Sequence, residues 1–159
     1  MLFRSVAELG KLGRWEVRPM GSLELLPEEL RTKLNSVATK SKGIEGVIVN
    51  VAIGYGGRKE IVDAVKNVIS ESARSGKSAQ EIADALSVED INKNLYTAGQ
   101  PDPELVIRTS GEQRLGGFLL WQSAHSEFYF CEAYWPDFRK VDFLRALRAY
   151  SIRERRFGS

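Results

Sequence analysis

The sequence has few of the residues that cross-link a chain or build common enzyme sites. Its 159 residues include one cysteine, Cys131, so no disulfide can form within the chain, which fits a reducing compartment. Cys131 lies in the apolar run 128–133, which favours a packed thiol over a nucleophile. Because His125 is the single histidine, the chain cannot form a His-rich metal site, and a Ser–His–Asp triad would have no other histidine to use.

Long apolar runs and a strong net charge are also missing. No stretch approaches the roughly 20 apolar residues of a membrane span, and the first residues, MLFRSVAELGKLG, are too short and too charged for a signal peptide. We therefore expect a cytoplasmic protein, with a peripheral place at the membrane as the alternative. The formal charge of +2 is too weak to indicate a nucleic-acid partner.

Basic residues nevertheless gather near the C-terminal end, where they outnumber the acidic ones. They are Arg139, Lys140, Arg145, Arg148, Arg153, Arg155 and Arg156, against Asp142 and Glu154. This cluster is either a solvated helix face or a binding surface for anionic groups.

The strongest structural signal is the apolar, β-branched run 46–53 (GVIVNVAI). It is typical of a central parallel strand that helices bury on both faces. The turn 54–58 (GYGGR) and a helix with apolar residues at helical spacing follow it directly. This strand–turn–helix unit predicts an α/β fold, with a mostly parallel open sheet flanked by helices, and the length predicts one domain over 1–159. The glycines either cradle a phosphate at the helix N-terminus or serve only a tight turn.

Other elements are predicted from spacing and capping signals. We expect further strands at 15–21, 105–109 and 128–133. One helix should start at Ser22 or Pro27. Two more should start at Ser78 and Ser87, where each serine has a capping signal. Further helices are expected over 118–125 and 138–150. In the last helix, Val141, Leu144, Leu147 and Tyr150 should face inward.

The stretch 103–138 carries the candidate chemistry. Arg108 stands at the end of a predicted strand, and Arg114 follows across a glycine-rich loop. Guanidinium groups bind phosphate or carboxylate through two parallel hydrogen bonds. The backbone of Ser110 and Gly111 could add donors to the same anion.

One acid beyond the loop, Glu127, could give an oxygen to Mg²⁺, which takes one or two carboxylates together with phosphate oxygens and waters. The alternative is that Arg108–Glu112 and Arg114–Glu127 are structural ion pairs.

Several ordered motifs in this chain resemble the cis-prenyltransferases, the undecaprenyl diphosphate synthase family. They are RTSGEQR (108–114), FLLWQ (118–122), Glu127, WPDF (135–138), RRFG (155–158) and YGGR (55–58). The amino-acid sequences of these motifs are most similar to those of the short-chain branch that makes Z-farnesyl diphosphate.

The resemblance implies a transferase of isoprenoid biosynthesis that joins isopentenyl diphosphate to an allylic diphosphate, forms a cis double bond and releases pyrophosphate. It places isopentenyl diphosphate at Arg108, Arg114, Leu115 and Gly116, and Mg²⁺ at Glu127. It also implies a homodimer in which Arg156 and Gly158 reach the partner subunit's substrate site.

Two departures from the family pattern limit this expectation. Gly116 stands where the family usually has serine, so a hydroxyl donor is lost and its return should tighten substrate binding. The N-terminal HxxxDGNxRWA and serine-rich motifs are absent, and with them the expected catalytic aspartate. We therefore expect the C-terminal part of an enzyme whose first part was cleaved, truncated or encoded separately. This part supplies the isopentenyl diphosphate and magnesium half-site and is inactive alone if the N-terminal part is missing. Its candidate partners include a separate N-terminal fragment or a catalytic subunit. The alternative is a non-catalytic partner subunit of a heteromeric cis-prenyltransferase.

Overall fold

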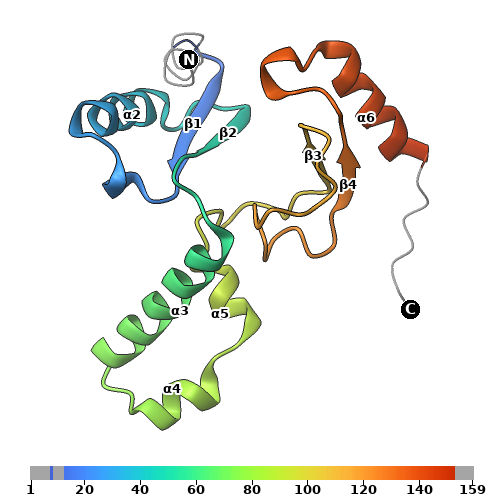
Figure 1. Ribbon diagram of the computed structural model, residues 1–159. Helices are drawn as coiled ribbons and strands as arrows, with labels where there is room; N and C mark the ends of the chain where they lie inside the picture. The colour runs from blue at the N-terminus through green and yellow to red at the C-terminus, as the bar shows by residue number, and fades with distance from the viewer. Residues whose placement is uncertain (1–7, 9–12, 153–159) are drawn as a thin grey trace. The chain divides into compact units, whose positions relative to one another are not determined.

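The protein divides into two compact units, Met1–Ala98 and Gly99–Ser159. The structure, a computed structural model, describes Glu8 and residues 13–152 (Figure 1). Each unit is built on one pair of parallel strands with helices beside it. The predicted α/β class with parallel strands is confirmed, while the single domain over 1–159 stays a prediction. Within the described ranges, no helix is both long and apolar enough to cross a bilayer.

The N-terminal unit begins with two strands in parallel register. β1 (Trp15–Met20) pairs with β2 (Val47–Ala52), from Trp15↔Val47 to Met20↔Ala52. Helix α2 (Glu28–Ser41) starts directly after Pro27, as predicted, and packs on β1. A short 3-10 helix, η1 (Leu23–Leu25), lies between β1 and α2. The buried side chains of Val17, Leu34 and Ile53 form the core of these elements.

The predicted burial of β2 on both faces is wrong. Val47 is 60% exposed and Ile48 is 38% exposed at the start of the strand. The physical reason is that β2 pairs only with β1 in the described part of the chain, and the helix beside this sheet packs on β1. The apolar run forms the predicted strand, but little packs against its start.

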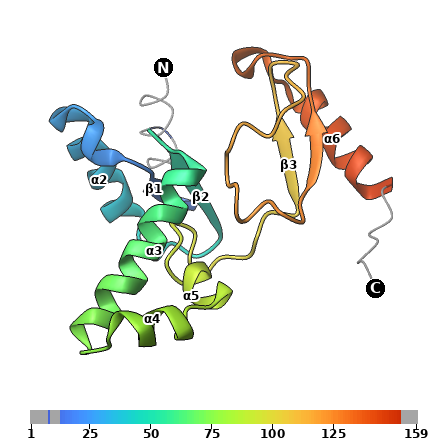
Figure 2. The same ribbon diagram turned by 60° about the horizontal axis from the view of Figure 1, so that its bottom comes forward.

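Three helices complete this unit, and α3 contacts both of the others (Figure 2). α3 (Gly57–Arg74) follows the glycine turn and buries Ala64 and Val68. α4 (Ala79–Ala85) and α5 (Val88–Asn92) each begin with a capping box, in which Ser78 pairs with Glu81 and Ser87 with Asp90. Both predicted caps are confirmed, although α5 is shorter than expected.

The C-terminal unit holds the second parallel pair. β3 (Leu105–Arg108) pairs with β4 (Glu127–Phe130), and α6 (Lys140–Ile152) contacts β4. A 3-10 helix, η2 (Trp135–Asp137), lies between β4 and α6. The helix predicted over 118–125 is wrong, because residues 116–125 form turns. Gly116, Gly117 and Leu119 have positive φ angles of 67°, 76° and 46°, which a right-handed helix does not accommodate.

The inward face of α6 also differs from the prediction. Val141, Leu144 and Leu147 are 42%, 50% and 39% exposed, whereas Ala146 and Asp142 are buried. Asp142 turns inward because its carboxylate accepts hydrogen bonds from both the backbone N–H and the side chain of Arg139. Tyr150 is half-buried and donates a hydrogen bond to Glu104 at 3.0 Å.

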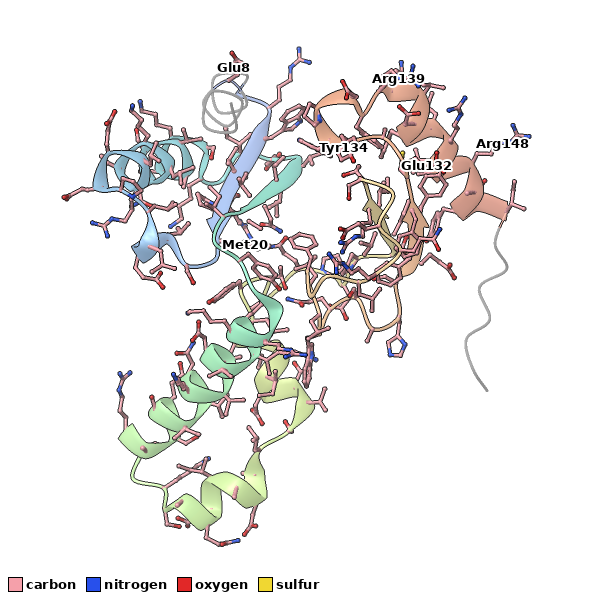
Figure 3. The ribbon with its side chains drawn as sticks, viewed as in Figure 1. Glu8, Met20, Glu132, Tyr134, Arg139 and Arg148 are labelled. Carbon is pink, nitrogen blue, oxygen red and sulfur yellow. The ribbon has the colours of Figure 1, made fainter. Side chains whose placement is uncertain are left out.

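The described part of the basic cluster fits a solvated helix face. Arg139 and Arg145 both pair with Asp142, at 3.1 and 3.4 Å, while their side chains stay 70% and 65% exposed. Figure 3 shows Arg139 just before α6 and Arg148 within it.

Candidate functional site

The loop after β3, residues 109–117, is joined to the segment that follows β4. The N–H of Cys131 donates to the carbonyl of Arg108 at 2.7 Å, the N–H of Ser110 to Ala133 at 2.9 Å, and the N–H of Gly111 to Cys131 at 3.0 Å. Ser110 reaches this position with a φ of 80°. The prediction that Ser110 and Gly111 offer backbone donors to an anion is therefore wrong, since both N–H groups already have backbone acceptors.

One carboxylate in this loop, that of Glu112, holds both arginines. Nη2 of Arg108 lies 2.5 Å from Oε2 of Glu112, and Arg114 binds the same carboxylate with Nε at 2.8 Å and Nη2 at 3.0 Å. The predicted Arg108–Glu112 pair is confirmed, whereas Arg114 pairs with Glu112 rather than with Glu127. Hydrogen bonds from Arg114 first, and then from Arg108, lower the pKa of Glu112. The loop thus brings two cations to one anionic group.

This arrangement can exchange its anion, because the pairing is largely exposed. The side chain of Arg114 is 75% exposed and that of Glu112 44%, while Arg108 is 23% exposed. Exposed ion pairs contribute roughly 0–1 kcal/mol each. A phosphate group that offers several oxygens to the two guanidinium groups can therefore displace Glu112 at small cost.

Gly116 lies directly against the guanidinium of Arg108. A Cβ built on Gly116 would overlap Nη1 of Arg108 and would lie 3.2 Å from Cζ and 3.4 Å from Nη2. That serine at 116 would add a donor therefore stays a prediction, and the flexible end of Arg108 would have to move to admit it. Leu115, the neighbouring residue of the predicted site, is 52% exposed.

Glu127 lies at the other end of the strand pair. In the parallel register Leu105 is opposite Glu127, and Arg108 is opposite Phe130. Three residues along the strand direction separate these two residue pairs by about 10 Å. Because side chains alternate between the two faces along a strand, Glu127 and Arg108 lie on opposite faces of the strand pair. The predicted site that contains both Arg108 and Glu127 is therefore not brought together within this unit of one chain.

The described residues supply one candidate ligand for magnesium. Glu127 is half-buried and is a hard oxygen ligand of the kind that Mg²⁺ takes singly or in pairs, so it fits this metal as one ligand. Across Glu8 and 13–152, no group of three or more His, Cys, Asp or Glu side chains is placed to hold a metal ion. Arg156 and Gly158 lie outside the described residues.

A buried network beside the glycine turn was not predicted from the sequence. Glu60 is 1% exposed and accepts hydrogen bonds from the hydroxyl of Tyr55 and from the N–H of Tyr96, the latter at 2.8 Å. The hydroxyl of Tyr96 donates to Asp63 at 2.6 Å. Burial and this bond raise the pKa of Tyr96 to about 12. The signal for Glu60 was its position four residues before Ala64 and eight before Val68, on the buried face of α3.

Comparison with known proteins places this α/β chain in a family of enzymes named as diphosphate synthases. The family model described as "Putative undecaprenyl diphosphate synthase" matches residues 2–158. The chain belongs to the undecaprenyl diphosphate synthase family.

Two curated relatives and one solved structure give the degree of similarity. The chain is 58% identical to a (2Z,6E)-farnesyl diphosphate synthase of Thermobifida fusca over 154 residues, which cover 97% of this chain and 60% of the relative. It is also 58% identical to a short-chain Z-isoprenyl diphosphate synthase of Mycobacterium leprae, covering 91% and 55%. The crystal structure of lavandulyl diphosphate synthase from Lavandula x intermedia in complex with dimethylallyl diphosphate has a TM-score of 0.87 and 32% identity, covering 99% and 66%. The chain thus spans a little over half the length of these curated relatives.

Proposed function

We propose that this chain serves in cis-prenyl transfer, the condensation of isopentenyl diphosphate with an allylic diphosphate to a Z-polyprenyl diphosphate and pyrophosphate. The reaction breaks the carbon–oxygen bond to the allylic diphosphate, forms a carbon–carbon bond to isopentenyl diphosphate and releases one proton. The observation that carries the proposal is the pair of guanidinium groups of Arg108 and Arg114, gathered on one carboxylate at the end of β3. The relatives named as Z-farnesyl diphosphate synthases support it.

In this proposal Arg108 and the loop after β3, residues 109–117, bind the diphosphate of isopentenyl diphosphate. Arg108 and Arg114 release Glu112 and take phosphate oxygens in its place, while Leu115 and Gly116 lie next to the bound group. Arginine suits this role because its planar group makes two parallel bonds to phosphate. The two positive charges then hold the substrate in place for attack on the allylic carbon.

The remaining roles lie partly beyond this loop. Glu127 contributes one oxygen to Mg²⁺, which when bound neutralises charge on the departing pyrophosphate. Since Glu127 is at the opposite end of the strand pair from Arg108, further ligands come from elsewhere in the assembled enzyme. We propose a cytoplasmic or membrane-peripheral homodimer in which Arg156 and Gly158 serve the partner subunit's substrate site. The catalytic aspartate comes from the part of the enzyme that carries the N-terminal motif, either within the same protein or on a separate fragment.

Two arginine variants with equal loss of charge test the binding role. Arg114→Ala removes an exposed, paired guanidinium from the loop, and Arg145→Ala removes a similarly exposed and paired one from α6. Calorimetric titration with isopentenyl diphosphate should show about 10- to 100-fold weaker binding for Arg114→Ala, because hydrogen bonds to charged groups contribute about 1.5–3 kcal/mol. Binding to Arg145→Ala should stay within about twofold of the parent. Equal losses of affinity in the two variants would show that net charge alone causes the effect, and would refute the assignment of Arg114 to the diphosphate.

Turnover separates this proposal from the non-catalytic alternative. The chain should form Z-prenyl product from isopentenyl diphosphate and an allylic diphosphate only when it is combined with an N-terminal fragment that carries the DGN motif. If it instead binds isopentenyl diphosphate, yields no product with that fragment and raises the activity of an intact homologue, it is a partner subunit.

A further inference from the structure

We infer that Glu60 is a positioning residue, which holds the glycine turn 54–57 and the chain at Tyr96 in one fixed arrangement. This inference rests on the proposed function only for its effect on turnover. Its structural part lies wholly within the N-terminal unit and does not depend on the reaction.

The first observation is that one buried carboxylate binds two segments that lie far apart in the sequence. Glu60 is 1% exposed, and its Oε2 accepts a hydrogen bond from the hydroxyl of Tyr55, while its Oε1 accepts one from the N–H of Tyr96 at 2.8 Å. The rings of the two tyrosines also meet edge to face, with their centroids 6.2 Å apart. The three residues therefore form a closed set of contacts, in which a shift of one disturbs the other two.

The second observation is that packing alone does not account for a carboxylate at this position. Glu60 shares the buried face of α3 with Ala64 and Val68, where an apolar side chain would fill the space. A buried charge is costly unless hydrogen bonds compensate for it. Both carboxylate oxygens accept such bonds, and each bond fixes a segment outside α3. What the carboxylate adds over an apolar side chain is therefore the position of these two segments.

The third observation concerns the turn that Glu60 holds. Ligands of open α/β sheets bind outside the carboxyl ends of the strands, and the turn 54–57 follows the carboxyl end of β2. Gly56 is exposed, and a Cβ built on it would meet no atom within 4 Å. Its φ of −148° is open to any residue, so nothing in the part of the chain that the structure describes requires glycine there. A bare backbone of this kind suits the close approach of another group.

The consequence for the proposed reaction is an effect on turnover and not on the binding of isopentenyl diphosphate. Arg108 and Arg114 belong to the C-terminal unit, where Glu112 pairs with both of them. Loss of the Glu60 carboxylate should leave this pairing intact. It should loosen the turn after β2, and with it the arrangement of the assembled site.

Two variants serve as controls for the loss of the carboxylate in Glu60→Ala. Glu60→Gln keeps the size of the side chain, and its amide can accept from the N–H of Tyr96 and donate to the hydroxyl of Tyr55. Tyr96→Phe removes a hydroxyl that donates to a different carboxylate of α3, that of Asp63, and leaves the backbone N–H on Glu60. We therefore expect both controls to retain the position of the turn.

The structural test is amide hydrogen exchange in this chain, measured at residue 96 relative to Val17. The N–H of Val17 donates to the buried Ser41 in the same unit, so it corrects for a general loss of stability. Exchange at residue 96 should accelerate by at least about tenfold in Glu60→Ala and in Tyr55→Phe, which alters a different segment. The acceleration should stay below about threefold in Glu60→Gln and Tyr96→Phe.

The functional test uses the chain combined with an N-terminal fragment that carries the DGN motif. Glu60→Ala should lower kcat at saturating substrate by at least about tenfold, and Glu60→Gln should restore it to within about threefold of the parent. Calorimetric titration of Glu60→Ala with isopentenyl diphosphate should give an affinity within about twofold of the parent. General destabilisation would instead accelerate exchange at Val17 and weaken this binding as well, and would refute the positioning role.

The two readouts distinguish this inference from the proposed function. If the assembled parent makes no product, the proposed function fails, while selective acceleration at residue 96 still supports the positioning role. If exchange at residue 96 is unchanged in Glu60→Ala, or if Glu60→Gln is as impaired as Glu60→Ala, the inference is overturned. An unchanged kcat for Glu60→Ala in an active assembly would overturn it as well.

Discussion

The carboxyl ends of β1 and β2 approach each other so closely at Gly21 that a methyl group there should destabilise the N-terminal unit. Gly21 has a φ of 108°, and a Cβ built on it would overlap the carbonyl oxygen of Ile53 and lie 3.2 Å from Cα of Tyr55. These obstacles are backbone atoms, which cannot turn aside as a side chain can. We therefore expect Gly21→Ala to force the two strand ends apart.

The magnitude follows from the hydrogen bonds beside the contact. The N–H of Ile53 donates to Met20 at 2.9 Å, and the N–H of Ser22 donates to Gly54 at 3.3 Å. The loss of both removes about 2 kcal/mol, at about 1 kcal/mol net for each bond. Left-handed strain adds about 1–2 kcal/mol. The free energy of unfolding should therefore fall by about 3–4 kcal/mol.

Gly43→Ala is the control, since Gly43 has a φ of 78° and a Cβ there would meet no atom within 4 Å. It shares the left-handed strain and the change in unfolded-state entropy, so the two variants should differ by about 2 kcal/mol. Urea and thermal unfolding followed by circular dichroism measure this difference, which corresponds to about 8–16 °C in Tm for a unit of this size. Equal losses in the two variants would refute the reasoning from the Ile53 carbonyl.

Three further predictions concern the same unit. Ser41→Ala should lower the free energy of unfolding by about 1–3 kcal/mol, because the buried hydroxyl accepts the N–H of Val17 at 3.0 Å. Ser36→Ala, at an exposed residue, is the control and should change the free energy of unfolding by less than about 0.5 kcal/mol. Equal urea midpoints for Ser41→Ala and Ser36→Ala would contradict the stabilising role of the Ser41 hydroxyl. Leu34→Ala should lower the free energy of unfolding by about 2–5 kcal/mol, because Leu34 is 2% exposed in the core. Leu25→Ala, at a residue 75% exposed, should lower it far less. Similar thermal midpoints for the two variants would argue against the core described above. The pKa of Tyr96 is raised from 10.0 to about 12, so the folded state keeps a proton that the unfolded state loses, and stability present below pH 10 should be lost as the pH rises toward 12. Urea unfolding at pH 9 and pH 11 should show this fall in the parent and a smaller one in Tyr96→Phe, and a fall of equal size in both would exclude Tyr96 as its source.

Local signals in the sequence predicted the elements that depend on local interactions. The capping boxes at Ser78 and Ser87 formed as expected because each joins residues three positions apart. The run 46–53 gave a strand because β-branched side chains fit a pleated sheet. In contrast, the apolar spacing of 118–125 predicted a helix that positive φ angles at Gly117 and Leu119 prevent.

The candidate site depended on information that the sequence does not hold. Arg108 and Arg114 were identified correctly as neighbours, because a short loop joins them. The position of Glu127 depends on the register of β3 against β4, which no local signal encodes, and that register separates it from Arg108. The contact of Gly116 with Arg108 likewise follows from the turn geometry and not from residue type.

The shared carboxylate of Glu112 also affects the rates of binding. While Glu112 holds both arginines, it cancels one of their two positive charges, so an approaching anion is attracted by a net charge of about one, and this attraction is largely screened beyond a Debye length of about 8 Å. Once the anion has displaced Glu112, it binds both guanidinium groups at full charge. Association should therefore depend weakly on salt, and most of the affinity should appear as slow dissociation.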